Sequence, residues 1–147
     1  MPELVGGTAW LNGEKTKADL IGGKPTLIHF WSVSCNMCKE SMPDVNDLRD
    51  RFKEDLNVVA VHIPRSEGDL DLELIKASAK EHDIKQPIIV DSEMKLTDAF
   101  GNTHVPAYYV FDKNRQLRHF QAGSKGMKML ENRVNRVLDE MKQSDQE

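Results

Sequence analysis

Residues 26–43 read TLIHFWSVSCNMCKESMP, and this stretch decides the fold. Its first part, Thr26–Trp31, is rich in apolar and aromatic residues and has the length of one strand. Such a run predicts a strand that is covered on both faces within a mainly parallel sheet. Cys35 and Cys38 follow at once, so the strand leads directly into a Cys-x-x-Cys pair.

The residues after the pair have the pattern of an amphipathic helix that begins near Cys35. Apolar side chains recur at intervals of three or four residues and so share one helical stripe. They are Met42, Val45, Leu48 and Phe52. The local order is therefore strand, Cys-x-x-Cys and helix.

The middle of the chain continues this alternation. Residues 58–63 and 87–90 have the composition of buried strands, and a stripe of Leu72, Ile75 and Ala79 marks a crossover helix between them. This order is typical of βαβ units, which build parallel sheets.

The last third of the chain changes character. Residues 107–111 predict a strand, 112–116 a polar turn, and 117–121 a strand that returns antiparallel. A closing amphipathic helix is marked by Met127, Leu130, Val134, Val137 and Met141. The whole pattern predicts an α/β fold, a three-layer sandwich in which a mixed central sheet is flanked by helices.

The two ends of the chain carry weaker signals. Asn12-Gly13 suits the positive φ angles of a tight turn, and its place between residues 9–11 and 14–16 predicts an added N-terminal β-hairpin. Residues 142–147 are wholly polar and are expected to form a frayed tail. No repeat or linker interrupts the sequence, so we expect one domain over residues 1–147.

Composition narrows the functional classes. The 147 residues are 39% hydrophobic and 30% charged, with a formal net charge of −4. No apolar run approaches the ~20 residues of a membrane-spanning helix, and the interspersed charges provide no basic surface for nucleic acid. We therefore expect a monomer without a membrane span and without a nucleic-acid partner.

The first residues, MPELVGG, contain neither the basic nor the apolar segment of a secretory signal. Cytoplasmic residence is the default expectation. An exported protein whose export segment has been removed would have the same sequence, so an extracytoplasmic location stays open.

The two cysteines point to chemistry, because one pair separated by two residues cannot form the disulfide framework of a small secreted protein. The thiolate is the nucleophile in disulfide exchange, and the start of a helix lowers a thiol pKa through its unpaired N–H groups and its dipole. Cys35, at the strand-to-helix junction, is the expected attacking thiol. Cys38, nearly one turn further along, is the expected resolving thiol.

Two other uses of this pair are open: inert buried thiols, or half of a zinc site. A zinc site needs further ligands, and the chain has no second Cys-x-x-Cys. The histidines, at positions 29, 62, 82, 104 and 119, lack close paired spacing. Redox chemistry is therefore favoured over zinc binding.

Several features together resemble thioredoxin-like proteins. They are the segment Phe30–Lys39, Pro43 five residues after Cys38, and Val105-Pro106 before a late strand. The segment Cys38–Pro43 and the Trp10 hairpin are similar to the TlpA/ResA branch of that superfamily. The resemblance covers nearly the whole chain and implies a thioredoxin-like fold.

The resemblance also implies site residues: a catalytic thiol at Cys35, a resolving thiol at Cys38, and a cis peptide bond at Val105-Pro106 beside them. The exposed backbone of Val105 would then bind an extended substrate segment by strand addition. The implied activity is that of a thiol-disulfide oxidoreductase that reduces or exchanges disulfides in protein substrates.

No flavin, nicotinamide, haem or metal fingerprint is present, so no cofactor is expected beyond the redox-active cysteines. Electrons must then come from another protein or from a small thiol. Three alternatives stay open: an extracytoplasmic reductase of the cytochrome c maturation or sporulation type, a thioredoxin-fold binding module without turnover, and a metal carrier that uses Cys35 and Cys38.

The sequence departs from the family pattern at two places. His29 stands where thioredoxins have a buried Asp, and it is either a proton acceptor for Cys38 or a core histidine without a catalytic role. Ser41 stands where the TlpA/ResA branch usually has Glu, with Glu40 one residue early and expected on the surface.

Other candidate substrate contacts surround the pair. Asn36 and Met37 form the dipeptide between the cysteines, and Met37 offers an apolar contact to a partner protein. Trp31 either shields the disulfide or packs in the core. His104, directly before Val105-Pro106, either lines a substrate groove or is a solvated loop residue.

Overall fold

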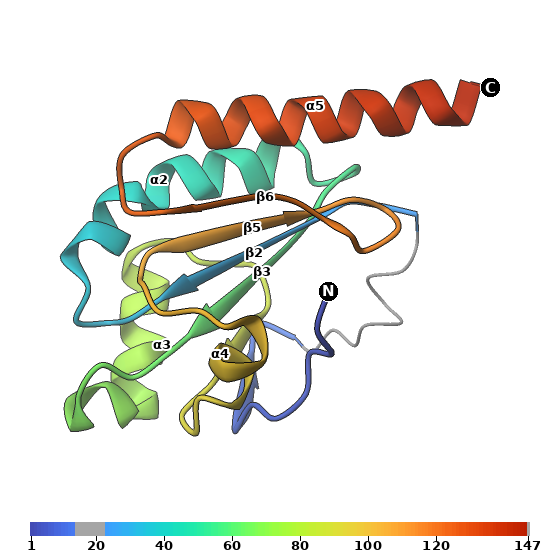
Figure 1. Cartoon of the computed structure of the whole chain (residues 1–147). Coiled ribbons are helices and arrows are strands. Elements are labelled where there is room, and N and C mark those ends of the chain that lie inside the picture. The colour runs from blue at the N-terminus through green and yellow to red at the C-terminus, as the bar shows by residue number, and fades with distance from the viewer. Residues whose placement is uncertain (14–22, 147) are drawn as a thin grey trace.

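Six strands form one sheet in the order β1-β4-β3-β2-β5-β6, with helices packed against it (Figure 1). The computed structural model describes residues 1–13 and 23–146, with side chains through residue 143. The strands are β1 (Ala9–Leu11), β2 (Thr26–Trp31), β3 (Asn57–His62), β4 (Ile88–Val90), β5 (Ala107–Phe111) and β6 (Leu117–Ala122). The helices are α2 (Asn36–Arg51), the 3-10 helix η1 (Glu67–Leu70), α3 (Leu72–Glu81), α4 (Lys95–Phe100) and α5 (Met127–Gln146).

The sheet is mixed, as the sequence predicts. Strands β2, β3 and β4 run parallel, because α2 and α3 carry the chain back to the same edge between them. Strand β5 is antiparallel to both β2 and β6, and the short polar turn after β5 makes β5 and β6 a hairpin. This mixed sheet with flanking helices agrees with the α/β sandwich that the sequence predicts.

Strand β2 is the central element and is buried along its whole length. Alternate residues enter two apolar clusters, one on each face of the sheet. Leu27 and Trp31 pack with residues of α2, α3 and α5, whereas Ile28 and Phe30 pack with Leu96 of α4 and the N-terminal segment. Burial on both faces explains the nearly continuous apolar run.

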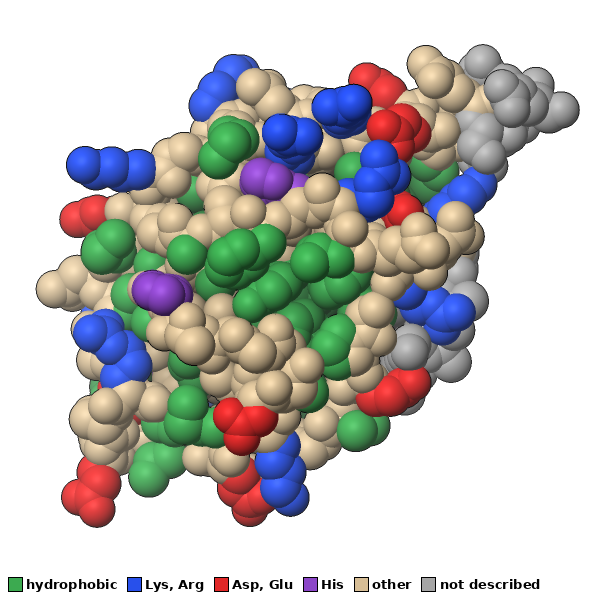
Figure 2. All heavy atoms as spheres, viewed as in Figure 1, with side chains coloured by type: hydrophobic (Ala, Val, Ile, Leu, Met, Phe, Trp, Pro, Cys, Tyr) green, Lys and Arg blue, Asp and Glu red, His purple; other side chains and the backbone are tan. Residues whose placement is uncertain are grey.

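One face of the sheet is partly open over β5 and β6, where Figure 2 shows apolar side chains gathered at the surface. Phe120 of β6 packs against Tyr109 of β5 and is 47% exposed.

The short helices were not predicted. Helix α4 spans six residues, too few to show a helical apolar stripe. It is held instead by Asp91, whose carboxylate accepts the N–H groups of Leu96 and Thr97. At the C-terminus, α5 continues to Gln146, so its backbone is helical where a frayed tail is expected from residue 142.

The N-terminal strand β1 lies at the sheet edge and is antiparallel to β4. Asn12 and Gly13, which follow it, have φ angles of 61° and 104°, as the turn prediction requires. The second arm of the predicted hairpin, residues 14–16, lies outside the described residues. Within the described part of the chain, no helix is both long and apolar enough to cross a membrane.

The core contribution of α5 can be tested with neighbouring residues. Leu130 is fully buried, whereas Met129 is 46% exposed. We expect Leu130→Ala to lower the free energy of unfolding by about 3 kcal/mol, because it leaves a cavity between α5 and the sheet. Met129→Ala, the matched control, should change it by less than about 0.5 kcal/mol. Urea denaturation measures both, and equal losses would contradict the packing described.

Candidate active site

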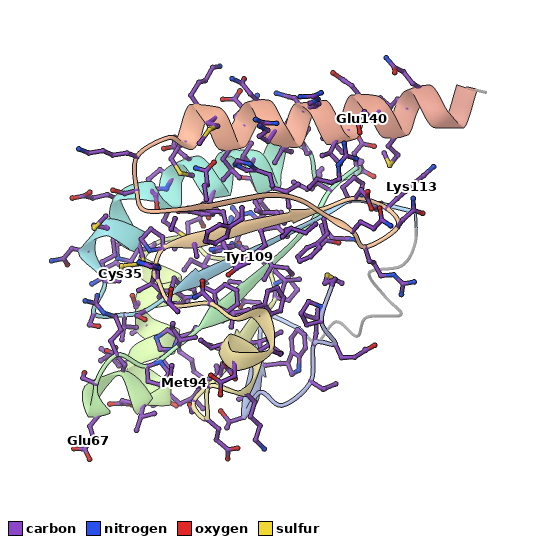
Figure 3. All side chains as sticks on the ribbon, in the orientation of Figure 1. Cys35, Glu67, Met94, Tyr109, Lys113 and Glu140 are labelled. Atoms are coloured by element: carbon purple, nitrogen blue, oxygen red, sulfur yellow. A yellow bond between two sulfur atoms is a disulfide. The ribbon has the colours of Figure 1, made fainter. Side chains whose placement is uncertain are left out.

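The two cysteines lie at the edge of the sheet where β2 ends and α2 begins (Figure 3). Cys35 is the N-cap residue of α2, and Cys38 lies in the first turn. Their sulfur atoms form a disulfide, and their Cα atoms are 5.3 Å apart. The structure thus places both residues where the sequence predicts them.

The backbone around Cys35 favours negative charge on its sulfur. The sulfur accepts the N–H of Cys38 at 3.1 Å, and the first turn of α2 contains no acidic residue. Unpaired N–H groups and the helix dipole therefore act on Cys35 without an opposing carboxylate on that turn. This is the environment that lowers the pKa of a thiol.

Both cysteines are buried in this oxidised form. Cys35 is 2% exposed and Cys38 is 1% exposed. In the disulfide state Cys35 therefore presents little surface to a reaction partner. The two thiols therefore differ in helical position and hardly in exposure.

The loop before Cys35 is hydrogen-bonded to the end of β3 and to the segment that follows it. Ser32 Oγ donates to the carbonyl oxygen of Ile63, and the Val33 N–H donates to His62 Nε2 at 3.1 Å. Ser34 Oγ donates to Asp69 at 2.8 Å. Sequence reasoning missed these partners, although the carboxyl ends of adjacent parallel strands meet at one edge, which is a signal for His62.

Trp31 belongs to the core. It is 1% exposed and packs edge-on against His62, with ring centroids 4.9 Å apart. Its assignment as a substrate-binding residue is therefore corrected, because a side chain buried this deeply does not present a surface to a substrate. Burial lowers the pKa of His62 to about 4, against an opposing effect of Asp69, so this imidazole is neutral and accepts the Val33 N–H.

His29 is buried beneath α2, and its imidazole is hydrogen-bonded. Arg49 donates to Gln86 Oε1 at 2.8 Å, which turns the amide nitrogen of Gln86 toward His29 Nε2, also at 2.8 Å. His29 Nε2 is thus an acceptor that is already occupied. Burial, and secondly Arg49, lower the pKa of His29 to about 3. These contacts favour the core-histidine interpretation over that of a proton acceptor for Cys38.

A pair of hydroxyl groups lies below the active-site helix. Ser41 Oγ is 2.6 Å from the hydroxyl of Tyr108 and donates to the carbonyl oxygen of Cys38 at 3.1 Å. Burial raises the pKa of Tyr108 to about 12, so this phenol stays neutral. Glu40 is exposed, as the sequence predicts. The position three residues after Cys38 therefore carries a neutral hydroxyl, where the resemblance to the TlpA/ResA branch implies Glu.

The remaining predicted contacts lie at the same end of the sheet. Asn36, Met37 and His104 are exposed, with Met37 at 47%. Val105 is partly buried between both apolar clusters, and the Val105–Pro106 peptide bond is cis. Ala107, the next residue, pairs with Phe30 near the end of β2, so the loop before β5 reaches the edge that holds the disulfide.

A metal centre has little support in the described part of the chain. No three His, Cys, Asp or Glu side chains come together there as metal ligands. The two sulfur atoms of the site are bonded to each other.

Comparisons with known proteins agree with this geometry. Residues 7–120 match the model of the AhpC/TSA family. The chain is 70% identical over 140 residues to the thiol-disulfide oxidoreductase YkuV of Bacillus subtilis (strain 168), covering 95% of each chain. It is 24% identical over 127 residues to the thiol-disulfide oxidoreductase ResA of Bacillus cereus (strain ATCC 10987), covering 86% of this chain and 71% of the relative. The solution structure of a thioredoxin-like protein in its oxidised form superposes with a TM-score of 0.89, at 70% identity and 95% coverage of both chains.

The buried histidines predict a loss of stability in acid. The pKa values of His29 and His62 are lowered in the folded state, so the unfolded chain binds more protons below pH ~6.5. The free energy of unfolding should therefore be fully retained above that pH and fall as the pH decreases toward 4. Each histidine should contribute up to about 1.4 kcal/mol per pH unit.

His29→Asn keeps an acceptor beside Gln86 but removes the titrating group, so it should flatten this pH dependence. Urea denaturation between pH 4.5 and 7 measures the slope. A slope equal to that of the unsubstituted chain would show that His29 is not a buried neutral imidazole.

Proposed function

The chain belongs to the AhpC/TSA family, and from this premise we propose that it reduces disulfides in protein substrates, with Cys35 attacking and Cys38 resolving. It is a thiol-disulfide oxidoreductase with a thioredoxin-like fold. The observation that carries the division of roles is the position of Cys35 at the N-cap of α2, where its sulfur accepts a backbone N–H. Cys38 lies inside the first turn of α2, and its backbone N–H is the group that donates to the Cys35 sulfur.

Two exchange steps transfer two electrons. The Cys35 thiolate attacks one sulfur of the substrate disulfide, which forms a mixed disulfide and releases the other substrate sulfur as a thiolate. Cys38 loses its proton and attacks the Cys35 sulfur, which forms the intramolecular disulfide and releases the second substrate thiolate. A dithiol protein or two small thiol molecules then return two electrons to the pair. No further cofactor takes part in these steps.

The proposed docking edge surrounds the disulfide. Met37 offers an exposed apolar side chain, and Asn36 and His104 offer exposed polar ones. Val105 is the proposed point of backbone pairing with an extended segment of the substrate.

The neutral surroundings of Cys38 favour a general reductase. Ser41 and Tyr108 are uncharged hydroxyls, whereas the TlpA/ResA resemblance implies an acidic side chain at that place. We therefore favour a general reductase over the more specialised chemistry of cytochrome c maturation. We further propose that it works in the cytoplasm and as a monomer. Thiol trapping in fractionated cells tests the compartment, and sedimentation velocity tests the oligomeric state.

Single-cysteine variants test the two roles. With insulin as substrate and dithiothreitol as the electron source, we expect Cys35→Ser to lose all catalysed reduction. Cys38→Ser should instead accumulate a mixed disulfide through Cys35, because resolution is blocked. Mass spectrometry of the trapped adduct identifies the linked cysteine. Full activity of Cys35→Ser would exclude the proposed reaction. If neither the unsubstituted chain nor the variants reduce insulin, and the chain holds tightly bound metal, a metal carrier would be favoured instead.

The direction of electron flow follows from the reduction potential. For a reductase we expect a value close to the roughly −270 mV of thioredoxin. Equilibration of Cys35 and Cys38 against defined ratios of reduced and oxidised glutathione measures it, with alkylation and mass spectrometry as the readout. A value near the roughly −120 mV of strong oxidants would instead assign disulfide formation to the pair.

A further inference from the structure

A buried carboxylate approaches the active site from a segment that the reaction does not use. Residues 64–71 connect β3 to α3 and include η1. Most of this segment is exposed, but Asp69 is 3% exposed. Figure 3 shows Glu67, at the start of η1, on the same side of the molecule as Cys35.

The carboxylate of Asp69 accepts two hydrogen bonds, and both use the same oxygen atom. Oδ2 accepts the hydroxyl of Ser34 at 2.8 Å and the backbone N–H of Arg65 at 2.8 Å. The guanidinium group of Arg65 in turn lies 3.4 Å from the carbonyl oxygen of Ser34. The three residues thus form a closed ring of hydrogen bonds, and a buried carboxylate that is held on two sides fixes its partners strongly.

The ring holds the residue directly before the nucleophile. Ser34 precedes Cys35, whose N–H donates to the carbonyl oxygen of Ser32 at 3.0 Å. The thiolate of Cys35 is stabilised only while its sulfur faces the N–H groups of α2, so a shift of this loop would weaken that stabilisation. Nothing else in residues 64–71 is buried against the loop to the same degree as Asp69.

We propose that Asp69 is a positioning residue for Cys35, acting through Ser34 and Arg65. The inference rests on the proposed function for the role of Cys35, but it concerns a property of the free thiol. Asp69 touches neither the sulfur nor a substrate. Its contribution is an acceptor at a fixed place, which keeps the Cys35 sulfur at the start of α2.

The effect of the negative charge of Asp69 can be separated from the effect of its hydrogen bonds, because its carboxylate accepts both bonds through a single oxygen. Asp69→Asn keeps one oxygen for Ser34 and Arg65 but removes the negative charge, whereas Asp69→Ala removes the acceptor. Arg65 and His62 are the other charged or titratable groups that bond to the loop, and Lys39 and Glu40 follow it on the first turns of α2. All four stay unchanged in these variants.

The test measures the reactivity of Cys35 in the reduced chain, with Cys38→Ser as background so that one thiol reacts. Iodoacetamide alkylation across pH 5–9 reports both the thiolate fraction and its rate. We expect Asp69→Ala to slow alkylation at pH 7 by about tenfold and to move the profile to higher pH. Asp69→Asn should stay within about twofold of the background. An unchanged profile for Asp69→Ala, or an equal loss for Asp69→Asn, would overturn the inference.

Asp71 provides the matched control in the same segment. Its carboxylate caps α3 by accepting the N–H groups of Glu73 and Leu74. Asp71→Ala should lower the urea midpoint but leave the alkylation profile in place, and a shift like that of Asp69→Ala would show general loosening instead of positioning. If Asp69→Ala does not fold, Ser34→Ala removes the other end of the contact and should slow alkylation similarly.

The outcome is separable from that of the proposed function, because alkylation requires no disulfide substrate. Failure of the unsubstituted chain to reduce insulin would refute the reductase assignment and leave the Asp69 result standing. An active reductase with an unaltered Asp69→Ala profile would refute the positioning role alone.

Discussion

Strand β2 is hydrogen-bonded on both sides and buried on both faces, and the position of the cysteines depends on this double constraint. A slip of one residue would turn Leu27 and Ile28 to the wrong faces, so the register of the strand is strongly specified. The end of β2 is thereby held at one point of the sheet edge, and α2 begins there with Cys35 as its cap. Because a thiol pKa responds to the dipoles around it, the packing of β2 contributes to the pKa of Cys35 by fixing where that residue lies.

Two buried polar residues near the active site, His29 and Ser41, are hydrogen-bonded within the core. His29 is satisfied by Gln86, and Ser41 by Tyr108 and a backbone carbonyl. An unsatisfied buried group would cost about 1–3 kcal/mol, so each such contact also specifies the packing of the elements that it joins. Both groups are neutral, so the charge on the Cys35 sulfur is stabilised mainly by the start of α2 and by the loop before it.

That loop is anchored from outside the strand-helix unit. His62, the last residue of β3, and Asp69, in the segment after β3, hold successive residues of the loop. The segment between β3 and α3 therefore does more than connect two elements, since it supports the site from the neighbouring strand.

By itself the sequence determined the order of the longer elements and the reactive pair. Apolar runs and helical stripes located β2, β3, β5 and α5, because burial of long elements leaves a periodic trace in the residues. The spacing of Cys35 and Cys38 at a strand-to-helix junction carried the redox interpretation. Such signals are local, so they can be recognised without knowledge of the fold.

Only the tertiary structure decided what surrounds the pair. Helix α4 is too short to leave a pattern, and the partners of His29 and Ser34 lie 57 and 35 residues away in the chain. For Trp31 the sequence leaves shielding of the disulfide and core packing open, and only the structure shows that this side chain is buried. Burial and long-range hydrogen bonds depend on which elements meet in space, and no local pattern of residues encodes that meeting.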